Sequence, residues 1–175
     1  ALFVVLSAHA ENYRACNSSA LPEGLLNEGF QHTRNQLAAN FKARHSANDS
    51  ITVFGKVSQL EGKFSYGLAG KDLKDEVVEV WVDDCRGKYA LIHRGRTNSD
   101  GRLLWGIATD ILGKPGVYKI WLRVVGDGSG ATLTLRVVPN GSKIAVFDID
   151  GTLTPNEDNL SPDVASDLIS GRYSP

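Results

Sequence analysis

Residues 116–138 read GVYKIWLRVVGDGSGATLTLRVV, and this stretch decides the fold class. Two apolar runs flank a turn at residues 126–130, whose glycine and aspartate residues tolerate a positive φ angle. In the second run Leu133, Leu135 and Val137 alternate with less apolar residues, as side chains do in a strand with one buried face. The stretch therefore predicts a β-hairpin.

Apolar runs of the same kind recur toward the N-terminus as far as residue 51, separated by glycine and aspartate clusters. They read ITVFGKV, KFSYGLA, VVEVWVDD, KYALIHRG and RLLWGIA. Seven short strands at this spacing predict a mainly β fold, an immunoglobulin-like antiparallel β-sandwich over residues 51–140. Trp81, Trp105 and Trp121 lie within these strands, so core packing explains them better than a binding surface does.

Residues 22–44 have a helical pattern ahead of the predicted sandwich. Apolar residues recur about four apart and predict one buried face: Leu25, Leu26, Phe30, Leu37 and Phe41. The stretch HSANDS, residues 45–50, is typical of a linker. Residues 11–50 are therefore expected to form a helical N-terminal segment and linker.

The first ten residues, ALFVVLSAHA, resemble the end of a secretory signal peptide, with an A-x-A cleavage site before Glu11. A buried first strand is the alternative interpretation. The signal-peptide remnant predicts a secreted, periplasmic or extracellular protein. In that setting Cys16 and Cys85 would form one disulfide, and two buried thiols are the alternative.

Composition narrows the functional classes. Apolar residues make up 42% of the chain and charged residues 22%, as in soluble globular proteins. The net charge is −1 and no basic stripe occurs, so we expect no binding to nucleic acid. The sequence holds no P-loop, no G-x-G-x-x-G and no local Ser/His/Asp signature. The four histidines are scattered without metal-ligand spacing.

The stretch KIAVFDIDGTLTPNED, residues 143–158, carries the clearest chemical motif. Asp148 and Asp150 follow an apolar strand and emerge on one side of it, at the end where open α/β sheets bind ligands. Such a carboxylate pair suits Mg²⁺. One aspartate can attack phosphorus, the other can act as general acid and base, and Thr152 can hold the two in register. An EF-hand is excluded, because glycine stands at position four rather than six.

The motif resembles the first motif of the haloacid dehalogenase (HAD) superfamily of phosphatases. Residues 116–154 are similar to the lipin-type branch and the strands before it, as in membrane-associated phosphatidylinositol transfer proteins and exported bacterial relatives. The resemblance implies that Asp148 is the nucleophile and a Mg²⁺ ligand. It implies that Asp150 is the acid/base and binds the metal through its carbonyl, and that Thr152 orders the loop. It also implies a β-sandwich before the HAD domain.

The later HAD motifs are missing from the 21 residues after Thr154. We therefore interpret residues 143–175 as the start of an incomplete HAD domain. The complete protein is expected to hydrolyse a phosphomonoester with Mg²⁺ through an aspartyl-phosphate. The resemblance favours phosphatidic acid as substrate, and the present chain is expected to be inactive alone. The alternatives are a non-catalytic module that binds a phospholipid or phosphate, and a β-sandwich for adhesion or assembly. The expected partners are a phosphorylated small molecule or an acidic phospholipid, with a membrane surface as a further partner.

Overall fold

A computed structural model of the chain describes residues 21, 24–83 and 89–144. The chain divides into two units, residues 1–140 and 141–175. The first unit holds one α-helix, α1 (Thr33–Ala38), and one 3-10 helix, η1 (Thr109–Leu112). Its described strands are β1 (Ser46–Ala47), β2 (Ser50–Val53), β3 (Val57–Lys63), β4 (Ser65–Tyr66), β5 (Lys71–Asp72), β6 (Val77–Asp83), β7 (Tyr89–Arg96), β8 (Arg102–Ala108), β9 (Gly116–Val124) and β10 (Gly130–Val138).

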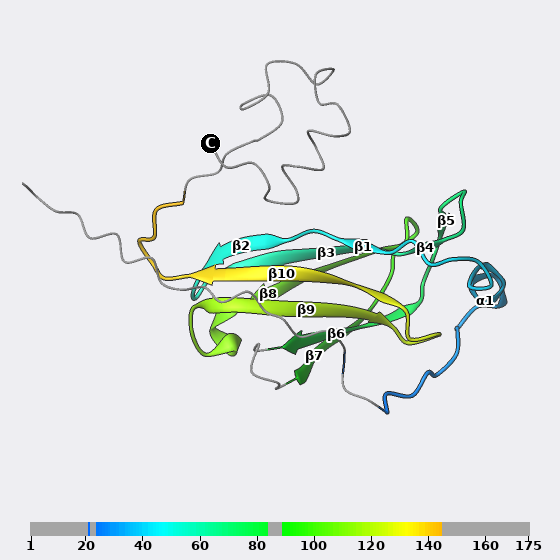
Figure 1. Cartoon of the computed structure of the whole chain (residues 1–175), viewed down its shortest axis with the longest axis horizontal. Coiled ribbons are helices and arrows are strands. Elements are labelled where there is room, and N and C mark those ends of the chain that lie inside the picture. Colours follow the sequence, from blue (N-terminus) through cyan, green and yellow to red (C-terminus); the bar gives the residue numbers. More distant parts are fainter. Residues whose placement is uncertain (1–20, 22–23, 84–88, 145–175) are drawn as a thin grey trace, which may run out of the picture. The chain divides into compact units, whose positions relative to one another are not determined.

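Two main sheets form a sandwich, as Figure 1 shows. The larger has the strand order β2-β10-β9-β6-β7, the smaller has the order β1-β3-β8, and β4 and β5 form a separate pair. The predicted mainly β sandwich with an N-terminal helix is confirmed. One strand pair departs from the prediction, because β2 runs parallel to β10. β2 and β3 follow each other in the chain but belong to different sheets.

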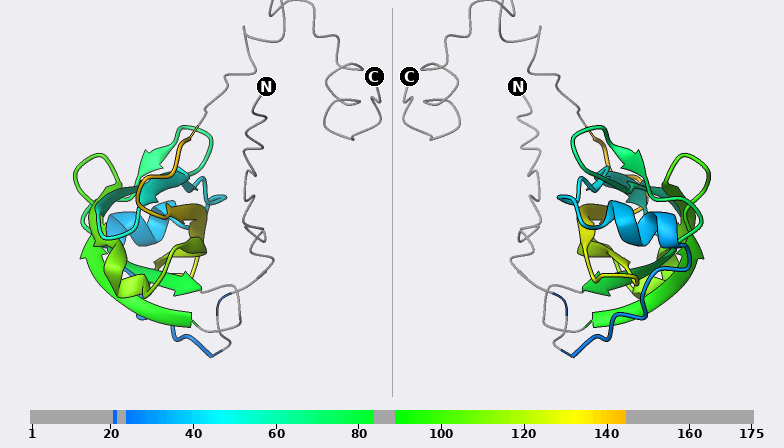
Figure 2. Two further views of the ribbon diagram at one scale, coloured as in Figure 1. Left: turned by 90° about the vertical axis from the view of Figure 1, so that its left-hand side faces the viewer. Right: turned by 90° about the vertical axis from the view of Figure 1, so that its right-hand side faces the viewer.

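The core lies between the two sheets, whose strands curve around a common interior in the end-on views of Figure 2. The predicted alternation is confirmed at β10, where Leu133, Leu135 and Val137 point inward and are buried. Phe64 and Ile107 are completely buried as well. Burying a side chain of this size stabilises the fold by about 1.5–3 kcal/mol.

The N-terminal segment differs from its prediction. The helix covers only Thr33–Ala38, whereas the pattern predicted helix over residues 22–44. Gly24 and Gly29 adopt φ angles of 83° and 78°, which an α-helix cannot include. The predicted linker at residues 45–50 also contains β1 and the start of β2, because Ser46 and Ala47 pair with β3.

The tryptophans divide between two environments. Trp105 packs against the core, as predicted. Trp81 and Trp121 lie opposite each other on β6 and β9. Each alternates along its strand with fully or nearly fully buried residues, so both side chains lie on the outward face of the sheet. The prediction of core packing is therefore wrong for these two.

Several predictions concern residues outside the described part of the chain. They are the signal-peptide remnant at residues 1–10, the pairing of Cys16 with Cys85, and the HAD-like start, of which only residues 143 and 144 are described. These stay predictions. In the described ranges no helix is long and apolar enough to cross a membrane.

Candidate functional site at the α1 end of the sandwich

The carboxylate pair predicted from the sequence, Asp148 and Asp150, lies outside the described residues, and so does Thr152. Their roles and the binding of Mg²⁺ stay predictions. Within residues 21, 24–83 and 89–144, no group of three or more His, Cys, Asp or Glu side chains could hold a metal ion. The candidate site described below is built from other residues.

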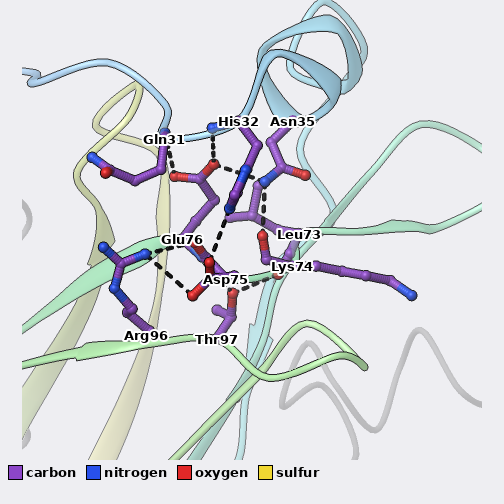
Figure 3. A network of polar contacts seen from close by, with 9 residues as sticks. All are labelled: Gln31, His32, Asn35, Leu73, Lys74, Asp75, Glu76, Arg96 and Thr97. Carbon is purple, nitrogen blue, oxygen red and sulfur yellow. Dashed lines mark hydrogen bonds and ion pairs between the residues drawn. The ribbon is translucent and has the colours of Figure 1, made fainter.

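A buried carboxylate positions α1 at one end of the sandwich (Figure 3). Glu76 is 1% exposed and accepts hydrogen bonds from the backbone N–H groups of Gln31 at 2.9 Å and His32 at 3.0 Å. It also accepts one from Asn35 Nδ2 at 2.7 Å. A six-residue helix is not stable by itself, because too few backbone hydrogen bonds form to offset the ordering of its first turn. Glu76 therefore holds α1 in place.

Asp75 continues this network at the surface. Its φ angle is 54°, the left-handed region that few residues other than glycine adopt. The carboxylate contacts His32 Nε2 at 2.9 Å and Arg96 Nη1 at 3.2 Å, as Figure 3 shows. The hydrogen bond from His32, together with Arg96, lowers the pKa of Asp75 below its ordinary value. These contacts join the residue before α1 to β7.

A second polar network ties the chain after α1 to the turn between β9 and β10. His45 Nδ1 accepts the Ser65 N–H at 3.2 Å, and His45 Nε2 lies 2.9 Å from Ser129 Oγ. Asp127 accepts hydrogen bonds from Ser129 Oγ at 2.6 Å and from Tyr66 OH at 2.7 Å. Burial lowers the pKa of His45 and raises the pKa of Tyr66.

Ser129, His45 and Asp127 have the composition of a catalytic triad, but their hydrogen bonds run in the wrong direction. His45 Nδ1 accepts a hydrogen bond from the Ser65 N–H, so the neutral ring carries its proton on Nε2 and donates a hydrogen bond to Ser129. Ser129 in turn donates to Asp127. A histidine that donates to the serine cannot act as its general base, so this network is structural.

The lowered pKa of His45 predicts a loss of stability in acid. The unfolded state takes up a proton near the ordinary value of 6.5, whereas the folded state does so only at a lower pH. The free energy of unfolding is therefore expected to fall as the pH drops below 6.5. Urea titrations at several pH values check this. His45→Gln should show a smaller loss over that pH range, and an equal loss in both proteins contradicts the assignment.

Three large apolar side chains project from the end of the sandwich that these networks hold, and we call them the apolar tip. Leu37, Phe41 and Leu68 are 62%, 66% and 89% exposed. Phe41 borders Gly67, since a Cβ atom on Gly67 would lie 3.4 Å from Phe41 Cβ. The Gly67 N–H also donates to Lys42 O at 2.9 Å. The loop that carries Leu68 therefore lies against the chain that follows α1, and Figure 1 places α1, β4 and β5 at the same end.

Four exposed cations lie in the same stretches of chain as the apolar tip, and we call them the basic collar: Arg34, Lys42, Arg44 and Lys71. The stretches that carry tip and collar, residues 33–44 and 67–71, contain no acidic residue. The nearest carboxylates in the chain, Asp72 and Asp75, follow Lys71, and both form ion pairs. Apolar side chains flanked by cations form a surface that fits the interface of an anionic membrane.

The sequence pattern did not reveal the apolar tip. Leu37 and Phe41 were predicted to belong to the buried face of a long helix, and this prediction is wrong because the helix ends at Ala38. Leu68 lies in a turn far along the chain and was assigned to a strand. The signal in the sequence is the run of residues 33–44, which holds three cations and no acidic residue.

Comparison with protein families identifies one matching family, described as "PITM 1-3, beta-sandwich domain", over residues 43–137. Membrane-associated phosphatidylinositol transfer protein 1 of Rattus norvegicus is 34% identical over 142 residues, which cover 78% of this chain and 11% of the rat protein. Protein retinal degeneration B of Drosophila melanogaster is 31% identical over 118 residues, covering 66% of this chain and 9% of the fly protein. The chain thus spans about a tenth of the length of these relatives.

Among solved structures, the M1 domain from titin is similar with a TM-score of 0.35 and 10% sequence identity. The match covers 59% of this chain and 99% of the titin domain.

Proposed function

This chain belongs to the family of PITM 1-3 β-sandwich domains, and on that premise we propose that its sandwich is a non-catalytic module that binds the surface of an acidic phospholipid membrane. The observation that carries the proposal is the apolar tip within its basic collar. The relatives' names describe membrane-associated proteins, which supports the same proposal.

The expected energetics favour a reversible contact. Moving a Phe or Leu side chain from water into an apolar phase contributes about 1.5–3 kcal/mol. A lysine or arginine near an anionic leaflet contributes about 1 kcal/mol. Three apolar side chains and four cations are therefore enough for binding, without a membrane-spanning segment. Because the cationic contribution is screened by salt, binding should weaken as ionic strength rises.

Vesicle co-sedimentation of the chain tests the proposal. Binding to vesicles that contain phosphatidylserine should exceed binding to pure phosphatidylcholine vesicles. The double variant Phe41→Ser/Leu68→Ser should lower the partition coefficient at least about tenfold, because two inserted side chains are lost. Both residues are well exposed, so the fold should survive, and circular dichroism checks this.

The matched control is Val57→Ser/Leu104→Ser. These apolar residues are each 63% exposed, about as exposed as Leu37 and Phe41, and lie on β3 and β8 outside the basic collar. Their replacement should leave vesicle binding unchanged. Equal losses in both double variants, or equal binding to neutral and anionic vesicles, would show that the apolar tip is not the docking surface.

A second candidate function rests on Asp148, Asp150 and Thr152. A longer protein that continues this chain would then hydrolyse a phosphomonoester, with phosphatidic acid as the substrate that the resemblance favours. Mg²⁺ would be the cofactor, bound by the two aspartates. The coding sequence beyond Pro175 tests this candidate. A strand ending in Ser or Thr, a lysine and an acidic pair support it, whereas a sequence without them removes it.

A further inference from the structure

A polar hollow of about 220 Å³ opens on the smaller sheet. Its walls come from β1, β3 and β8 and the residue after β1, and they are Ser46, Ala47, Asn48, Glu61, Lys63 and Arg102. The residues of the hollow are close in the sequence to those of the basic collar. Lys71 of the basic collar is followed by Asp72, whose carboxylate pairs with Lys63, and Arg44 lies two residues before Ser46.

Two cations lie beside each other in the lining of this hollow. Lys63 on β3 is the direct cross-strand partner of Arg102 on β8, and Ser46 on β1 is the partner of Lys63 on its other side. Like charges directly opposite each other destabilise a sheet. The chain offsets this repulsion with two carboxylates, since Glu61 pairs with Arg102 and Asp72 with Lys63.

These two ion pairs are partly exposed, and Lys63 Nζ also donates to Asp100 O. The side chains of Lys63, Glu61 and Arg102 are 30%, 31% and 45% exposed. Ion pairs at this exposure contribute only about 0–1 kcal/mol each. An anion with a higher charge density than a carboxylate can therefore displace Glu61 from Arg102 at small cost. The guanidinium then offers two parallel N–H groups and Lys63 offers a point charge.

We propose that the hollow is a binding site for a phosphate group, held between Lys63 and Arg102 with Ser46 and Asn48 as donors on the wall. A tetrahedral phosphate has enough oxygens to accept from the guanidinium, the ammonium, a hydroxyl and an amide at once. The inference deepens the proposed function and rests on it for its biological source, which is the headgroup of a lipid in the bound membrane. A phosphomonoester headgroup, free of a covering alcohol, fits the hollow best.

Titration of the chain with inorganic phosphate at constant ionic strength tests the site, followed by the backbone amide signals of Ser46 and Asn48 in NMR spectra. Saturable shifts with a dissociation constant on the order of millimolar are expected, because Glu61 competes for Arg102. Arg102→Gln should weaken phosphate binding at least about tenfold, because the charge-assisted hydrogen bonds of the guanidinium are lost.

Glu61→Gln provides the sharper test, because removing the competing carboxylate should strengthen phosphate binding by about fivefold. A purely structural ion pair would give no such gain. Arg136→Gln is the matched control, an exposed arginine on β10 of the larger sheet that does not line the hollow, and it should change nothing. The absence of saturable shifts, or weaker binding in Glu61→Gln, overturns the proposal.

Vesicle binding distinguishes a lipid headgroup from free phosphate as the natural ligand of the hollow. At equal surface charge, vesicles with phosphatidic acid should bind the chain more tightly than vesicles with phosphatidylglycerol, and Arg102→Gln should remove the difference. Phe41→Ser/Leu68→Ser should weaken binding to both. If phosphate binds in solution but the two lipids are equivalent, the headgroup assignment is overturned. If vesicles bind but phosphate gives no shifts, the site fails while the apolar tip remains supported.

Discussion

Glu76→Ala is expected to lower the free energy of unfolding by about 3 kcal/mol, because three donors lose a buried carboxylate acceptor. The donors are the backbone N–H groups of Gln31 and His32 and the side-chain amide of Asn35, which is 2% exposed. Alanine leaves a gap that is closed to most water. Urea unfolding followed by tryptophan fluorescence measures the loss.

The matched control for this substitution is Glu28→Ala. Glu28 also pairs with a residue distant in the sequence, Arg94, but its side chain is 50% exposed. Its loss should cost less than about 1 kcal/mol. Hydrogen exchange at the Ala39 amide, which donates to Asn35 O, should rise in Glu76→Ala and stay unchanged in Glu28→Ala. Similar stability of the two variants would show that Glu76 does not hold α1.

Gly101→Ala is expected to be more damaging, by about 3–5 kcal/mol. Gly101 has a φ angle of 68°, and a Cβ atom there would lie 2.5 Å from Phe64 O and 3.1 Å from Leu73 N. Both of those atoms take part in the hydrogen bond between Leu73 and Phe64. Backbone cannot move aside as a flexible side chain can, so the connection between β3 and β5 must shift.

Gly113→Ala separates the two causes of this loss. Gly113 has a similar φ angle of 78°, but nothing lies within 4 Å of a Cβ atom at that position. The free energy of unfolding of Gly113→Ala should fall only by the cost of placing alanine in the left-handed conformation, about 1–2 kcal/mol. Thermal unfolding of both variants measures the difference. Equal losses would mean that the contact with Phe64 is relieved without cost.

Several strands of the sandwich could be predicted because their signal is local. Each carries its own alternation, so RLLWGIA coincides with β8 and GVYKIWLRVV with β9 to within one residue. β3 was missed, because ITVFGKV and KFSYGLA reach only its first and last residues and its inward positions include Ser58 and Gly62. The parallel pairing of β2 with β10 could not be predicted. Short strands of similar composition have no pattern that selects one partner among many.

The α1 end was missed because its signals are not local. Leu37 and Phe41 have helical spacing, and only the backbone at Gly29 and the hydrogen bonds to Glu76 show where the helix begins. Glu76 itself appears in the sequence as one more acidic residue at the start of a strand. The polar hollow joins residues of three strands, and their register sets which side chains meet.

The pairing of β2 with β10 also affects the order in which the chain folds. Ser50 lies beside Leu135, so this pair closes a loop that contains almost all of the sandwich. The β9–β10 hairpin, by contrast, joins neighbouring strands across a short turn. Loop-closure entropy and the dependence of folding rates on contact order both make such a long-range pair a late event. During synthesis, β2 therefore cannot pair with β10 until β10 has left the ribosome. Until then the backbone N–H and C=O groups of β2 are open to pairing with other chains.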